Sequence, residues 1–313
     1  MLFPITYSIP EEKIIKINTF SQKTKLVSSL IPGNTSTYVY NTEKEYYEEY
    51  QKSIFAITTK KAGWDCLRHY EIIANGCIPL FSEFDDCPPN TLALLPKDLI
   101  KEGNNLFIEI ASMSEITQEG VNKINSLVTR LLKYMLEHLT TKQMAKYVLK
   151  CVNCTEAKRI LYINPNHVDY LNDLMLHGFK ELLGIECHDY PKVKHIYKNQ
   201  NIDYTKLYGK GMTYTNLLDS SLHKECSNDD IEENIKNKYY DLIIYGLYHE
   251  GMPLYDLIKN VYEPNKIVLF CGDDIYKSNV FFDGHAHRFN KHCCDYKQWS
   301  DKGFNVFVRE LQE

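Results

Sequence analysis

The stretch that most constrains this chain is residues 53–81, which reads as strand, loop, helix and strand in immediate succession. Residues 53–58 form an apolar, β-favouring run, and residues 77–81 form a second one. Between them, Asp65 is predicted to cap a helix and Gly76 to end it in a left-handed conformation. This helix should bury a stripe of side chains at helical spacing, namely Leu67, Tyr70, Ile73 and Ala74. Such a unit predicts an α/β fold.

The same alternation returns in the second half of the chain. Strand-like runs lie at 159–163, 185–188, 240–245 and 266–271, with helical patterns at 169–183 and 253–262. Strands this continuously apolar are typical of a parallel sheet that is covered on both faces. A long helical pattern ends near residue 150, and polar residues cluster at 151–158. We therefore expect two Rossmann-like α/β domains, residues 1–150 and 151–313, with parallel sheets and a central cleft.

The composition narrows the classes of function. With 313 residues, 44% hydrophobic and 25% charged, the chain has the make-up of a soluble globular protein. A net charge of −5 provides no cationic field that would recruit nucleic acid. No run approaches the roughly 20 apolar residues of a membrane span. The N-terminus meets Pro4 too early for a signal peptide, so we expect a cytoplasmic protein with mostly reduced cysteines.

Charged residues gather around the predicted helix of the 53–81 unit. Lys60, Lys61 and Arg68 lie in or near the loop that leads into the helix, where free N–H groups and the helix dipole favour anions. Glu71 follows Arg68 by three residues and so shares its face. The cations suit a diphosphate, and the carboxylate suits ribose hydroxyls. The alternative interpretation is an ordinary salt-bridged surface helix.

The pattern Arg68-x-x-Glu71-x4-Gly76-Cys77-x-Pro79 resembles the signature of the exostosin-like glycosyltransferases. This resemblance covers about residues 50–100. It implies the two-domain fold called GT-B, a nucleotide-sugar donor and no obligatory metal. It also implies that Arg68 faces the diphosphate and Glu71 the nucleotide sugar. The predicted donor-binding residues are the following: Lys60, Lys61, Gly63, Trp64, Asp65, Arg68, His69, Glu71 and Asn75.

Polar residues in the second half follow predicted strands, where ligands of parallel sheets bind. They lie at 164–167, Asp189, 248–251 and 272–274. His249 and Glu250 are the best candidates for acid–base catalysis, because a base must take the proton of an acceptor hydroxyl. The alternative is that His249 merely lines a loop. The Gly-Lys-Gly segment at 208–215 lacks the spacing of a known phosphate loop.

Metal-ligand patterns are weak. Asp273-Asp274 fits helix caps or turns better than a metal site. His285, His287 and 292–294 stand far from Cys151-x-x-Cys154, whereas structural zinc ligands come in close pairs. We therefore expect no metal and no cofactor.

The sequence thus predicts a glycosyltransferase that moves a sugar from a nucleotide-sugar donor, UDP-linked by expectation, to a hydroxyl of a glycan or other acceptor. A non-catalytic sugar- or nucleotide-binding protein of the same architecture is the alternative, because only about 50 residues precede the signature and the family places an acceptor domain there. A Rossmann-like enzyme of another class is a third possibility.

Overall fold

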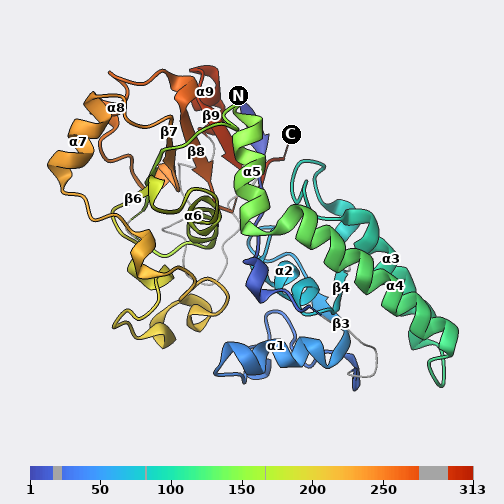
Figure 1. Cartoon of the computed structure of the whole chain (residues 1–313). Coiled ribbons are helices and arrows are strands. Elements are labelled where there is room, and N and C mark those ends of the chain that lie inside the picture. The colour runs from blue at the N-terminus through green and yellow to red at the C-terminus, as the bar shows by residue number, and fades with distance from the viewer. Residues whose placement is uncertain (17–22, 82, 166, 275–294, 313) are drawn as a thin grey trace.

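The chain builds two parallel β-sheets, as a computed structural model shows (Figure 1). The structure describes residues 1–16, 23–81, 83–165, 167–274 and 295–312. Within them the helices are α1 (Glu43–Gln51), α2 (Leu67–Ala74), α3 (Lys97–Ala111), α4 (Gln118–Tyr134), α5 (Thr141–Cys151), α6 (Tyr170–Leu183), α7 (Asn228–Lys236), α8 (Tyr255–Ile258) and α9 (Tyr296–Asp301). The expected α/β class with parallel sheets is confirmed.

The larger sheet has six parallel strands. Their order is β1 (Leu2–Pro4), β9 (Asn305–Val308), β8 (Ile267–Cys271), β7 (Leu242–Tyr245), β5 (Ile160–Ile163) and β6 (Cys187–Tyr190). All residues of the four central strands are buried, which explains their unbroken apolar sequences. After β5 the chain adds β6 on one side and then β7 on the other, so the sheet has its topological switch point between β5 and β7.

The smaller sheet has three parallel strands, in the order β2 (Lys25–Val27), β3 (Ser53–Thr58) and β4 (Ile78–Phe81). Helix α2 connects β3 to β4, as the sequence predicted. The long hairpin of α3 and α4 packs beside β4 and α2 and extends away from the rest of the molecule (Figure 1).

The first strand ties the two ends of the chain together. Residues Leu2, Phe3 and Pro4 pair with Val306, Phe307 and Val308, so the start of the chain lies in the sheet of the second half. Not all of residues 1–150 therefore belong with the smaller sheet. The division into two Rossmann-like domains stays a prediction.

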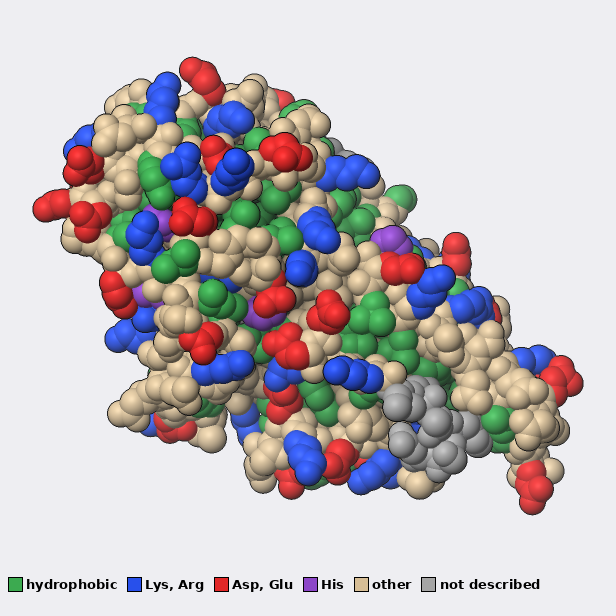
Figure 2. Space-filling model, viewed as in Figure 1, with side chains coloured by type: hydrophobic (Ala, Val, Ile, Leu, Met, Phe, Trp, Pro, Cys, Tyr) green, Lys and Arg blue, Asp and Glu red, His purple; other side chains and the backbone are tan. Residues whose placement is uncertain are grey.

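Several local expectations need correction. The apolar run Leu-Ala-Leu-Leu at 92–95 predicts a strand, but it forms turns and a bend, with Leu92 at a φ of 53°. The helical pattern at 253–262 yields only α8, Tyr255–Ile258. The pattern at 117–150, which allowed one long helix or two abutting helices, divides at Thr140, whose side chain accepts a hydrogen bond from the Gln143 amide and so caps α5. No helix in the described part of the chain is long and apolar enough to cross a membrane. Figure 2 shows cations and anions interspersed over one face.

Candidate functional site

The signature lies on β3, a loop at 59–66, α2 and β4. Strands β3 and β4 pair in parallel from Phe55 opposite Ile78 to Thr58 opposite Phe81. Helix α2 buries all its residues except Arg68, and Gly76 ends it at a φ of +63°, the left-handed stop that was predicted. The sequence thus predicted this strand–helix–strand unit correctly, including the parallel pairing of its strands.

A buried arginine fastens the loop to the larger sheet. The side chain of Arg309, just after β9, is only 2% exposed. Its Nε donates to the Gly272 carbonyl at 2.8 Å, and its Nη1 donates to the Asp65 carbonyl at 2.7 Å. Nη1 also bonds the Glu310 carboxylate at 2.9 Å, and Nη2 pairs with Asp274. The loop is therefore anchored at the carboxyl ends of β8 and β9.

The neighbouring Glu310 completes this anchor. Its carboxylate accepts hydrogen bonds from the backbone N–H groups of Trp64 at 3.1 Å and Asp65 at 2.9 Å. An added Cβ at Gly63 would overlap the carboxylates of Asp274 and Glu310, so both side chains would have to shift to admit a larger residue. The Gly63 and Trp64 that were predicted to bind a donor thus shape the loop that meets the sheet.

Asp65 is buried and does not cap α2, contrary to the prediction. Cys66 stands at the N-cap without a side-chain hydrogen bond. Instead, the Asp65 carboxylate accepts hydrogen bonds from the Tyr7 amide at 2.8 Å and the Tyr70 hydroxyl at 2.9 Å. Burial raises the pKa of Asp65 to about 7, although the Arg309 charge acts in the opposite direction.

His69 and Asn75 also make internal contacts. The His69 Nε2 lies 2.8 Å from the Trp64 carbonyl and must carry the proton, because a carbonyl only accepts. Its Nδ1 lies 2.8 Å from the Thr58 hydroxyl. Burial lowers the pKa of His69 to about 4, so the ring is neutral at pH 7. Asn75 donates to the Glu71 carbonyl at 2.9 Å at the end of α2.

Arg68 differs from these residues because its buried nitrogens are unpaired. Nε and Nη1 are inaccessible to solvent and have no hydrogen-bond partner among the described residues. The guanidinium carbon lies 5.2 Å from the centre of the Tyr38 ring, and Lys61 Nζ lies 5.9 Å from the same centre. Burial alone would raise the pKa of Tyr38, but a hydrogen bond with the Arg68 side chain and the Arg68 charge outweigh it and lower that pKa. Lys60 Nζ lies 4.7 Å from the Trp64 ring.

Glu71 is buried and bound by two hydroxyls. It accepts hydrogen bonds from Tyr46 at 2.6 Å and from Thr213 at 2.5 Å. Burial raises its pKa, although these hydrogen bonds and the Arg68 charge lower it. Among the described residues, no ion pair within 4.0 Å joins Arg68 to Glu71. The salt-bridged surface helix, the alternative interpretation of this pair, is therefore not what the structure shows.

The segment 204–216 of the second half reaches this site, which sequence reasoning missed. The Thr213 amide donates to the Glu43 carboxylate at 2.6 Å, and Lys210 Nζ donates to Asn41 at 2.6 Å. Three non-glycine residues in it have positive φ, at Lys210, Thr213 and Asn216. Its glycines signalled an unusual backbone, but only the tertiary structure reveals what it contacts.

His249 and Glu250 lie beyond the carboxyl end of β7, in a turn at Tyr248–Glu250. The His249 side chain is 3% exposed, and its Nε2 lies 3.1 Å from Asp273. Burial alone would lower the pKa of His249, but Asp273 and Cys271 outweigh it and raise the value to about 10. Glu250 is exposed and lies 3.6 Å from Nδ1 of His167.

Asp273 and Asp274 are adjacent in the chain and link the signature loop to the turn that holds His249. Asp273 lies beside His249, and Asp274 pairs with Arg309 next to the Gly63 backbone. The structure therefore brings the signature loop and His249 to the same carboxyl edge of the larger sheet. This edge is where parallel sheets bind ligands.

No group of three or more His, Cys, Asp or Glu side chains that could hold a metal forms within the described ranges. Cys151 and Cys154 are free thiols. The candidates His285, His287 and 292–294 fall outside the described residues.

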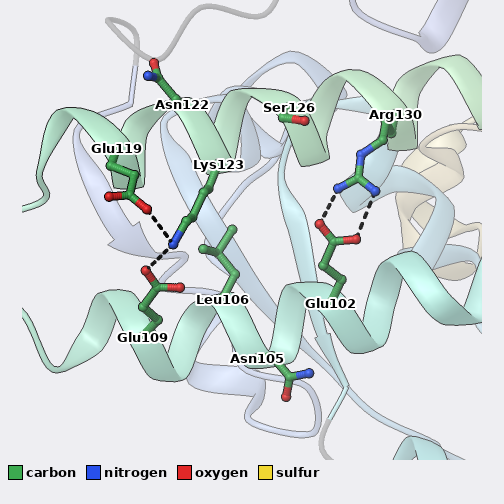
Figure 3. A pocket seen from close by; sticks show the side chains of 9 residues that line it. All are labelled: Glu102, Asn105, Leu106, Glu109, Glu119, Asn122, Lys123, Ser126 and Arg130. Atoms are coloured by element: carbon green, nitrogen blue, oxygen red, sulfur yellow. Dashed lines mark hydrogen bonds and ion pairs between the residues drawn. The ribbon is translucent and has the colours of Figure 1, made fainter.

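Two surface hollows lie away from the signature. The larger, about 450 Å³, runs between α3 and α4 (Figure 3). Its charged side chains pair with one another: Arg130 with Glu102, and Lys123 with both Glu109 and Glu119. The smaller, about 150 Å³, lies beside β6.

No family model matches the chain, and neither the curated proteins nor the solved structures contain a significant match. The resemblance to exostosin-like enzymes therefore rests on the signature residues alone.

Proposed function

We propose that this protein is a glycosyltransferase that uses a nucleotide-sugar donor and a hydroxyl acceptor. The observation that carries this proposal is the position of the signature. Its loop is anchored at the carboxyl edge of the larger sheet by Arg309 and Glu310, and Arg68 beside it has two buried nitrogens without acceptors. An anion is the natural partner of such a guanidinium, because its planar N–H groups match phosphate oxygens.

In this proposal the donor diphosphate binds Arg68, with Lys60 and Lys61 at the exposed side. Glu71 exchanges the Thr213 hydroxyl for a hydroxyl of the donor, so that one hydrogen bond replaces another of the same kind. Segment 204–216 moves to allow this exchange. A UDP-linked sugar and a glycan acceptor remain our expectation from the signature.

The reaction breaks the bond between the anomeric carbon and the diphosphate oxygen and forms a bond to the acceptor oxygen. His249 is protonated at neutral pH because of Asp273. It is therefore suited to stabilise the negative charge on the departing diphosphate, and less suited to act as the base. Glu250 is exposed and takes the hydroxyl proton in this scheme. No residue of this scheme requires a metal or cofactor.

The non-catalytic alternative has one observation in its favour, which is that protein hydroxyls already bind Glu71. A panel of UDP- and GDP-sugars with glycan acceptors separates the two. We expect release of free nucleotide that depends on the acceptor and is lost in Glu250→Gln. Nucleotide binding without any turnover across the panel would favour the binding protein.

A further inference from the structure

The smaller hollow lies along β6, the edge strand of the larger sheet, far from the signature in sequence. Residues 188–192, 223–226 and Ile231 line its 150 Å³. Among the described strands β6 pairs with β5, and residues 223–226 lie beside β6 where they line the hollow. At about 30 Å³ per water, the hollow has the volume of about five waters. This is room for a small group of about five heavy atoms.

The mouth of this hollow already holds an anion, the carboxylate of Glu225. Lys192 Nζ lies 3.2 Å from it and His223 Nε2 lies 3.5 Å from it. Lys192 and His223 lower the pKa of Glu225. Yet the Glu225 side chain is 83% exposed, whereas His223 is only 6% exposed. Ion pairs of exposed side chains contribute little, so a competing anion can replace this carboxylate.

The interior supplies a neutral donor. His188 is 1% exposed, and its Nδ1 lies 3.0 Å from the Tyr240 hydroxyl, which leaves Nε2 buried and without a partner in the described structure. Burial lowers the pKa of His188 to about 4, so the ring is neutral and can carry its proton on Nε2. An unmade buried hydrogen bond costs free energy that a ligand can recover.

The acidic group inside, Asp189, is paired at Oδ1, whereas its Oδ2 is buried without a hydrogen-bond partner in the described structure. The Asp189 Oδ1 atom lies 2.7 Å from Lys180 Nζ and 2.9 Å from His223 Nδ1. Asp189 therefore does not repel a second anion as a lone carboxylate would. Lys192 and Lys224 remain as positive charges that can turn toward a ligand.

We propose that this hollow is a binding site for a phosphate group, which displaces the Glu225 carboxylate from Lys192 and His223. A phosphate has two negative charges and more acceptor oxygens than a carboxylate, so it can bind Lys192 and His223 and still offer an oxygen to the His188 N–H. The inference is independent of the donor site, because it shares no residue with the signature.

Calorimetric titration of inorganic phosphate, and separately of glycerol phosphate, into the full chain tests the proposal. We expect wild type to bind at least one of them at millimolar concentration or better. Lys192→Met should weaken binding about tenfold, since a hydrogen bond to a charged group is lost. Glu225→Gln should tighten it severalfold, because the competing carboxylate is gone. The control Lys236→Met removes a cation of α7 that pairs with Glu232 and should change nothing.

Binding of glycerol phosphate alone would identify a phosphate carried on a larger molecule as the ligand, and binding of both would include free phosphate. The proposal is overturned if wild type binds neither compound. It is also overturned if Lys192→Met binds as wild type does while thermal melting shows it folded, or if Glu225→Gln fails to gain affinity.

Discussion

Arg309 and Arg68 are two arginines beside the same loop, and their surroundings are opposite. Arg309 is 2% exposed and meets two backbone carbonyls and two carboxylates. Arg68 is partly buried, yet its Nε and Nη1 have no acceptor among the described residues. The contacts of Arg309 hold the signature loop against the larger sheet. Arg68 has the capacity to bind an anion that the protein itself does not supply.

This difference separates structural from functional residues within the signature. Gly63, Trp64, Asp65, His69 and Asn75 are used by the fold, because each shapes the loop or completes a hydrogen bond inside it. Lys60, Lys61 and Arg68 carry positive charge that no carboxylate in the described structure neutralises within 4.0 Å. We therefore propose the ligand-binding role for these three residues and for Glu71.

The largest effect is expected at Arg309. Replacing it by Met leaves buried carboxylates without their cation and should cost about 3–5 kcal/mol in the free energy of unfolding. Chemical denaturation monitored by tryptophan fluorescence measures it. The matched control is Arg130→Met, which removes an exposed ion pair with Glu102 and should cost at most about 1 kcal/mol. Equal losses in the two variants would show that Arg309 does not anchor the loop.

The next effect is the pH dependence that His69 produces. Its pKa is lowered to about 4 in the folded chain, below the ordinary value of 6.5, so the folded state binds fewer protons. Stability from His69 is full above pH 6.5 and is lost as the pH falls toward 4. The stability difference between wild type and His69→Gln should shrink over that window by on the order of 3 kcal/mol. A difference that does not vary with pH would mean that His69 is solvated.

Gly63→Ala should have a smaller effect. The new methyl group would overlap the carboxylates of Asp274 and Glu310, and crowding of this kind costs about 1–3 kcal/mol. It should also weaken nucleotide binding, because the loop carries Lys60 and Lys61. Denaturation curves and the affinity for UDP check both. Wild-type stability in the variant would contradict the close packing of this loop.

The sequence predicted the parallel α/β class, the strand–helix–strand unit at 53–81 and the left-handed Gly76. The spacing of apolar residues and the residues that end each element determine these features. The sequence did not predict that β1 pairs with β9 or that Thr213 bonds Glu71, because both contacts join residues far apart in the chain. Spacing placed Arg68 and Glu71 on one face, but it does not show that Tyr38 and Tyr46 contact them, because these contacts form only in the tertiary structure. Asp65 has the residue type of a helix N-cap, but its carboxylate is buried and accepts hydrogen bonds from Tyr7 and Tyr70 instead.

The central claim is that Arg68 receives the diphosphate of a nucleotide. Calorimetric titration of UDP and of GDP into wild type, Arg68→Ala, Arg68→Lys and the control Arg130→Ala tests it most directly. We expect wild type to bind at least one nucleotide and Arg130→Ala to bind it equally well. Arg68→Ala should bind at least about tenfold more weakly while thermal melting shows it folded. Arg68→Lys should recover only part of the affinity, because a point charge lacks the planar pair of donors. If wild type and Arg68→Ala bind the nucleotide with the same affinity, Arg68 is not the diphosphate-binding residue.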